Sequence, residues 1–166
     1  MPSERQETVT HSCMHAGVHT LRGTRAEQSA QVDRLRLVEC MTCQREAATE
    51  RAATEAARLA LPALAGAHAE VAAALRERAR RLSVVTDAAR AAYMRQAIAT
   101  SRGPLNAAAR AHLEDRARAA AERTALRLLA APLARTAARW WLDTRDMELD
   151  ELMSQATPSS PVGVPR

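Results

Sequence analysis

The chain has 166 residues, a formal charge of +5 and hydrophobic residues at 47% of its positions. This length suits one domain or an elongated helical hairpin and excludes a two-domain enzyme. Aromatic residues make up only 2% of the chain, which disfavours a β-sheet protein, because strands are rich in aromatic and β-branched residues. The abundant alanine, leucine and arginine are good helix formers. We predict an all-α fold: an elongated helical bundle of three long helices plus a short C-terminal helix, with flexible N- and C-terminal ends.

Residues 1–23 are polar, rich in histidine and serine, and lack a helical apolar period. They are expected to form a flexible N-terminal arm. Thr24 and Glu27 then fit a capping box, in which the threonine hydroxyl and the glutamate carboxylate each bind a backbone amide. A first helix is predicted over residues 25–61. Pro62 ends it or opens the next, because proline lacks an amide hydrogen and restricts the residue before it.

The second helix begins near Leu64 and ends at Gly103-Pro104. Its apolar and small residues are spaced alternately by three and four, a heptad-like seam that is typical of a helix packed on a neighbour. Pro104 suits the first turn of a third helix over residues 104–131, whose face is lined by alanines. Alanine buries little apolar area, which stabilises by only about 25 cal/mol per Å². We therefore expect a homo-oligomer.

The segment from Trp140 to Met153 places both tryptophans in an acidic frame. It is predicted to be a helix that docks into a partner's groove, because tryptophan supplies large contact area at interfaces. The alternative is a short helix that folds back, with the tryptophans filling space that the alanines leave open. The predicted partner-binding residues are Trp140, Trp141, Leu142, Met147, Leu149, Leu152 and Met153. Residues 156–166 are rich in proline and expected to be disordered, which leaves a helical domain over residues 24–155.

Three cysteines cannot all pair within one chain, and an odd number points to thiols or metal ligands. Cys40 and Cys43 form a C-x-x-C pair that can bind one zinc ion, and the arm offers further donors in His11, Cys13, His15 and His19. The predicted metal set is Cys13, His15 (or His19), Cys40 and Cys43, which would clamp the arm onto the first helix and supply folding energy. Two alternatives to a zinc site stay open. In the first, the cysteines are semi-buried and act as small hydrophobic residues. In the second, they form a redox-active dithiol.

The segment 36–44 resembles the helix of zinc-binding anti-sigma factors, whose pattern is His-x-x-x-Cys-x-x-Cys with leucine after the histidine. Leu37 and the two cysteines match this pattern, whereas Arg36 stands at the position of the histidine. Either a histidine of the arm replaces that ligand, or the likeness is accidental. The resemblance implies a protein that sequesters a transcription factor and releases it on a change of redox state or zinc.

The positive charge is unevenly distributed, because residues 140–166 hold five acids and two arginines while the rest is basic. A basic surface attracts nucleic acid, and the densest run contains Arg76, Arg78, Arg80 and Arg81. However, acids follow arginines at spacings of three and four, which is typical of a solvated helix face. A basic helical nucleic-acid-associated protein is therefore an alternative and not the leading hypothesis.

No stretch of about 18 uncharged apolar residues exists, so no membrane-spanning helix is predicted. Residues 1–20 lack the apolar segment of a secretory signal, and a cytoplasmic protein is expected. The sequence contains no P-loop, glycine-rich dinucleotide turn, H-E-x-x-H or nucleophile elbow, so no enzyme is predicted. The leading hypothesis is a non-catalytic protein-interaction module, structural or regulatory, that self-associates. The alternatives are the zinc- or thiol-dependent regulator and the nucleic-acid-associated protein.

Overall fold

The structure is a computed structural model that describes residues 3–101, 103 and 105–156. The chain divides into two compact units, which we call unit 1 (residues 1–51) and unit 2 (residues 52–166). Most described residues are helical, but the chain begins with two strands, so the predicted all-α fold is wrong. The expected boundary after residue 23 falls inside unit 1. The predicted disordered tail lies outside the described residues, except for Ala156.

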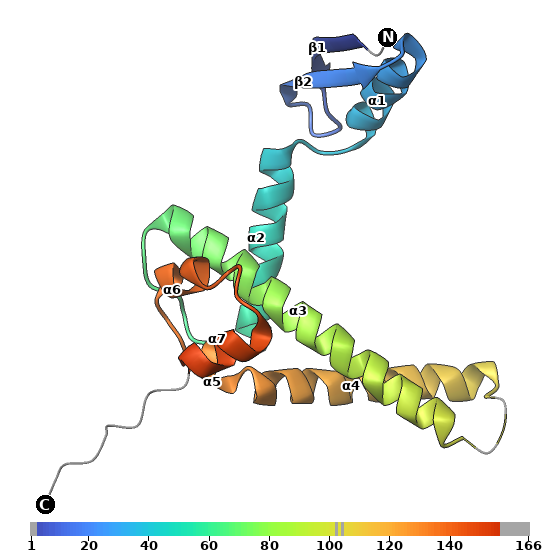
Figure 1. The fold of residues 1–166 in the computed structure, drawn as a ribbon, viewed down its shortest axis with the longest axis vertical. Coiled ribbons are helices and arrows are strands. Elements are labelled where there is room, and N and C mark those ends of the chain that lie inside the picture. The colour runs from blue at the N-terminus through green and yellow to red at the C-terminus, as the bar shows by residue number, and fades with distance from the viewer. Residues whose placement is uncertain (1–2, 102, 104, 157–166) are drawn as a thin grey trace, which may run out of the picture. The chain divides into compact units, whose positions relative to one another are not determined.

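Unit 1 contains a β-hairpin and a helix that packs on it (Figure 1). Strand β1 (Ser3–Thr10) pairs antiparallel with β2 (Ala16–Gly23), and helix α1 (Arg25–Leu37) follows directly. The predicted flexible N-terminal arm is therefore wrong. Polarity misled the prediction, because only every second side chain of a strand must be apolar when one face of the sheet is solvated.

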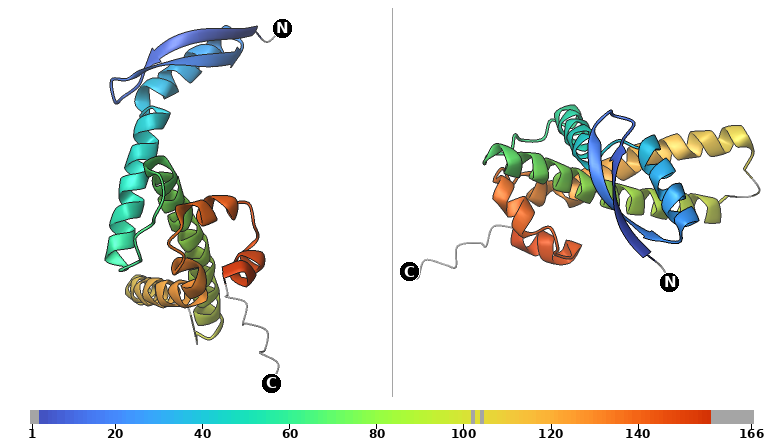
Figure 2. Two further views of the ribbon diagram at one scale, coloured as in Figure 1. Left: turned by 90° about the vertical axis from the view of Figure 1, so that its left-hand side faces the viewer. Right: turned by 90° about the horizontal axis from the view of Figure 1, so that it is seen from above.

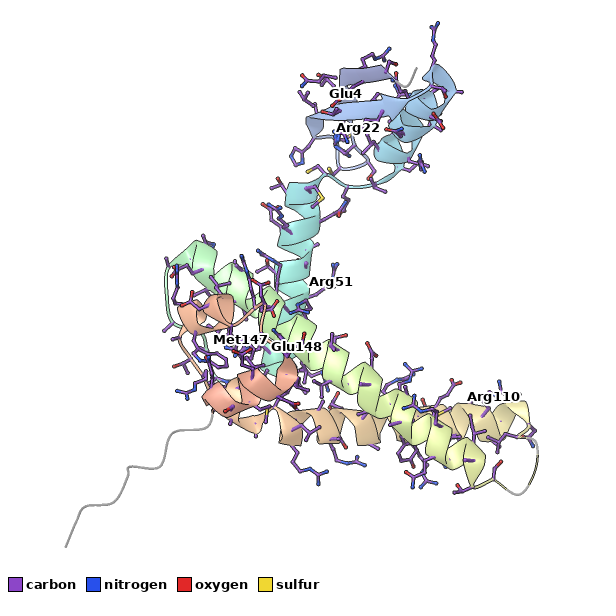
Figure 3. The ribbon with its side chains drawn as sticks, viewed as in Figure 1. Glu4, Arg22, Arg51, Arg110, Met147 and Glu148 are labelled. Atoms are coloured by element: carbon purple, nitrogen blue, oxygen red, sulfur yellow. The ribbon has the colours of Figure 1, made fainter. Side chains whose placement is uncertain are left out.

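The core of unit 1 is small. Val9 of β1 and Leu21 of β2 are buried against Val32 of α1, and Leu35 packs beside them. The opposite face of the hairpin is exposed and carries mostly polar side chains, with Val18 as its large apolar residue. There an ion pair at 3.5 Å links Glu4 of β1 to Arg22 of β2, and Figure 3 labels both residues.

The predicted capping box is confirmed at the start of α1. The Glu27 amide donates to the Thr24 hydroxyl, and the Thr24 amide donates to the Glu27 carboxylate at 2.7 Å. Gly23 precedes this cap with φ at +108°, in the region that favours glycine. A Cβ there would lie 2.4 Å from Glu27 Oε2, so any other residue would disturb the cap as well as strain the backbone.

The single first helix predicted over residues 25–61 is wrong. Helix α1 ends at Leu37, and helix α2 (Met41–Arg58) begins after an extended link in which Val38 has φ −115° and ψ 154°. No proline or glycine marks this break. Its physical cause is tertiary: the Val38 carbonyl accepts hydrogen bonds from the Ser12 amide and the His11 ring instead of continuing a helical ladder.

Unit 2 is built on two long helices that lie side by side, α3 (His68–Ala99) and α4 (Ala107–Leu128) (Figures 1 and 2). Asn106 caps α4, so this helix begins three residues later than predicted, and Pro104 lies outside the described residues. The short helices α5 (Ala130–Leu133), α6 (Ala138–Asp143) and α7 (Leu149–Ala156) replace the predicted single C-terminal helix. The description of three long helices plus one short helix is thus also wrong.

The core of unit 2 forms where the C-terminal helices meet α3 and α4. Trp141, Leu129 and Leu133 are buried together with Leu82 and Val85 of α3. The predicted seam of α3 is buried in its middle, around these residues, and becomes exposed toward Ala99. Within the described residues, no helix is both long and apolar enough to cross a membrane.

Candidate metal centre

Four potential metal ligands meet in unit 1. Cys13 and His15 lie in the turn between β1 and β2, while Cys40 and Cys43 lie at the start of α2. The ligand atoms of these four residues all lie within 4.8 Å of one another. The Nδ1 atom of His15 is 3.2 Å from the Cys43 sulfur and 3.7 Å from the Cys40 sulfur. Figure 3 shows sulfur atoms gathered at the start of α2.

Backbone hydrogen bonds shape the turn that carries the first two ligands. The His11 amide donates to the His15 carbonyl, and the Met14 amide donates to the His11 carbonyl, both at 2.9 Å. Met14 lies between the ligands with φ at +66°, a conformation that costs energy for a residue with a side chain. This tight turn places the side chains of Cys13 and His15 near each other.

The start of α2 presents the other two ligands. Residues three apart in a helix lie on one face, so Cys40 and Cys43 can reach a common point. The Cys40 amide donates to the Cys13 sulfur at 3.2 Å, and the Cys43 amide donates to the Cys40 sulfur at 3.5 Å. The first bond joins the two pairs of ligands, and the second lies within the pair at the start of α2.

The cluster changes the acidity of two thiols in opposite directions. The amide of Cys40, and next the backbone of His15, lower the pKa of Cys13 to about 6, because hydrogen-bond donors stabilise a thiolate. The Cys40 side chain, and next burial, raise the pKa of Cys43 to about 12. Cys13 therefore ionises more readily than an ordinary thiol, whereas Cys43 must lose a tightly held proton to become a ligand.

A set of three thiolates and one imidazole matches the ligand preference of zinc. Structural zinc sites are four-coordinate and tetrahedral, with Zn–S distances near 2.3 Å and Zn–N distances near 2.0–2.1 Å, so ligand atoms lie about 3.3–3.8 Å apart. The distance from His15 to the Cys40 sulfur, 3.7 Å, lies within this spacing, and the distance to the Cys43 sulfur, 3.2 Å, lies just below it. The residues present thus fit a zinc ion.

No protein-family model, curated protein or solved structure matches the chain.

The structure separates the other histidines of the N-terminal region from this group of four. His19, which the sequence offered as an alternative to His15, has its Nε2 atom 2.9 Å from Nε2 of His11. The ring of His11 also faces the carbonyls of Leu35 and Val38. Arg36, at the histidine position of the anti-sigma pattern, lies 3.5 Å from the Asp33 carboxylate and outside the group. The sequence gives no signal for the role of His11.

Two of the predicted partner-binding residues are buried in unit 2, and four others pack against its core. Trp141 and Leu152 are fully buried, and the Trp141 indole N–H donates to the Arg135 carbonyl at 3.2 Å. The other members of the set are half-buried: Trp140, Leu142, Met147, Leu149 and Met153. Trp141 and Leu152 therefore contribute to the fold of unit 2.

Arg78, Arg80 and Arg81, which belong to the basic run predicted for nucleic-acid binding, make contacts within unit 2. Arg78 is only 2% exposed and donates to the Pro62 carbonyl at 2.8 Å. Arg80 and Arg81 both bind the Glu77 carboxylate, and Arg81 donates to the Thr144 and Met147 carbonyls. Arg76, the fourth, is half-buried. Much of this basic run therefore supports the fold of unit 2.

Proposed function

We propose that unit 1 is a structural zinc module, in which Cys13, His15, Cys40 and Cys43 bind one zinc ion. The observation that supports this most directly is the convergence of four ligand atoms within 4.8 Å of one another, from two segments 25 or more residues apart. The ion would link the hairpin turn to the start of α2. Because four protein ligands leave no open coordination position for water or substrate, the role of the metal is structural and not catalytic.

The zinc content of the purified full-length protein tests this function. Wild-type protein is expected to carry one zinc per chain after extensive dialysis, measured by elemental analysis. His15→Gln and Cys40→Ser each remove a ligand and should lose most of the metal. His112→Gln is the matched control, because His112 is exposed on α4 in unit 2. A wild-type protein that folds normally without metal, or a His15→Gln protein that retains it, would refute the module.

A second candidate function, self-association, is supported by apolar side chains exposed on unit 1. Met14 is 81% exposed and Leu37 is 80% exposed, and together with Val18, Val38 and Met41 they form what we call the apolar set. Met14 and Met41 directly follow the ligands Cys13 and Cys40. Unit 1 holds seven arginines and seven acids, so two copies would meet without net charge repulsion. We therefore propose a second copy of unit 1 as the partner of the apolar set.

Light scattering over a range of protein concentrations tests the self-association. Leu37→Glu should shift a concentration-dependent dimer toward monomer, because it places a charge in an apolar contact. Val84→Glu is the control, since Val84 is 55% exposed on α3 of unit 2. A monomer at every concentration, or equal effects of the two substitutions, would count against it.

A further inference from the structure

The ring of His11 connects three parts of unit 1. Although His11 is a polar residue, it is only 5% exposed. Its Nδ1 atom lies 3.0 Å from the Leu35 carbonyl oxygen and 3.2 Å from that of Val38, at the end of α1. Its Nε2 atom faces His19 of β2 at 2.9 Å.

These partners determine which ring nitrogen carries the proton. Carbonyl oxygens only accept hydrogen bonds, so Nδ1 of His11 carries a hydrogen and donates it. Nε2 of the neutral ring is then an acceptor, and Nε2 of His19 must donate to it. A Cβ at Gly17 would lie 3.0 Å from His19 Nε2 and 3.4 Å from His11 Nε2, so glycine leaves room for the two rings.

The Nδ1–H donor of His11 lies between the two segments that carry the metal ligands. Leu35 lies in the last turn of α1, where carbonyls lack helical partners, and Val38 lies two residues before Cys40. The same residue, His11, closes the ligand turn through its amide and carbonyl, two residues before Cys13. One residue thus attaches the Cys13 and His15 turn to the segment that leads into Cys40 and Cys43.

We propose that His11 is the positioning residue of the zinc site. Its Nδ1–H holds the link between α1 and α2 against the ligand turn, so that the two ligand pairs stay at coordination distance. This inference rests on the proposed zinc module. Outer-shell groups that orient ligands typically change metal affinity by about 10–100-fold when they are removed, and His11 would act in this way through the backbone.

Titration of the metal-free full-length protein with Co²⁺, followed by competition with Zn²⁺, tests the proposal. His11→Phe keeps a ring of similar size but removes the donor, and should weaken metal binding by about 10–100-fold. The absorption bands of the Co²⁺ complex should keep their wild-type shape, because all four ligands remain. His11→Asn retains an N–H donor near the position of Nδ1 and should stay within about threefold of wild type.

His19→Gln is the matched control, because its amide can still donate to His11 Nε2, and it should also stay within about threefold of wild type. Wild-type affinity in His11→Phe would overturn the positioning role while leaving the zinc module intact. Equal losses in His11→Phe and His11→Asn would overturn it too, because the donor would then not be the important feature. If His11→Phe fails to fold, the comparison of His11→Asn with wild type decides. A wild-type protein that gives no Co²⁺ complex would overturn the module itself, and this inference with it.

Discussion

The two units of the chain bury very different amounts of apolar surface. In unit 1 the buried cluster consists of Val9, Leu21 and Val32. In unit 2 the cluster surrounds a fully buried tryptophan, Trp141. It contains residues of α3, α4, α5 and α6, and residues of α7 pack against it. The excess of positive charge also belongs to unit 2, since unit 1 has equal numbers of acids and arginines.

This difference indicates what each unit needs for stability. A unit of about 50 residues rarely gains enough from its core and usually requires a disulfide, a metal or a partner. The three cysteines are free thiols, and they lie with His15 in the smaller unit. Zinc would supply there what the core lacks, whereas unit 2 has enough apolar contact to fold through helix packing.

The largest effect is expected from removing zinc. Chelation should raise amide hydrogen exchange in β1, β2 and α1 by about 100-fold or more, because binding energy at a structural zinc site is folding energy. Exchange in α3 and α4 should change by less than about threefold, because their core contains no metal ligand. Hydrogen exchange followed by mass spectrometry measures both. Full protection of the hairpin in metal-free protein would contradict the contrast between the units.

The stability of unit 2 is expected to depend on its apolar core and not on zinc. Trp141→Ala should lower the free energy of unfolding of unit 2 by about 3–5 kcal/mol, because it creates a cavity at the centre of the buried cluster. Trp140→Ala is the control and should cost less, since Trp140 is half-buried. Urea unfolding measures both values. Zinc affinity should be unchanged in each variant, and a parallel loss of metal would show that the units do not act separately.

The sequence predicts a structural feature well when the residues that determine it are close together in the chain. The capping box at Thr24 and Glu27 is a local pattern of side chain and backbone, and it was predicted correctly. The hairpin was missed because its only buried apolar side chains within the strands are Val9 and Leu21. A period of two is present in the burial of the strand residues, since Glu7, Val9, Gly17, His19 and Leu21 are buried or half-buried. Because the chain is so rich in helix formers, its composition favours a prediction of helices over this short strand-like alternation.

The candidate site was predicted better than the fold around it. Cys40 and Cys43 are recognisable from their spacing, and Cys13 with His15 from their chemistry, so the structure brings together a group already named from residue types. The choice of His15 over His19 depends on where β2 begins, because His15 lies in the turn beside Cys13 and His19 lies within the strand. The sequence does not show this boundary. The break between α1 and α2 depends on His11 and Ser12, which are far away along the chain.

A buried arginine provides a smaller test within unit 2. Arg78→Met leaves the Pro62 carbonyl without the guanidinium donor that lies 2.8 Å away, and should destabilise unit 2 by about 1–3 kcal/mol. The cost is limited because burial already disfavours the charge, which is why the pKa of Arg78 is lowered. Arg118→Met, at an exposed ion pair with Asp115, should change stability by less than about 0.5 kcal/mol. Chemical unfolding of both variants makes the comparison, and equal effects would contradict a structural role for Arg78.

The smallest effect concerns protons in unit 1. The pKa of Cys43 is raised to about 12 while that of Cys13 is lowered to about 6, so between pH 7 and pH 8 Cys43 is protonated without metal and Cys13 is not. Zinc must displace at least the proton of Cys43, and its affinity should therefore rise about tenfold per pH unit or more, which is about 1.4 kcal/mol. Chelator competition at the two pH values measures this slope, and calorimetry in buffers of different ionisation enthalpy counts the released protons. Cys43→Ser, if it still binds, should release about one proton fewer, because its serine hydroxyl does not ionise in this range. An affinity that does not change with pH would mean that no thiol proton is lost on binding, and zinc would then not be held by Cys43.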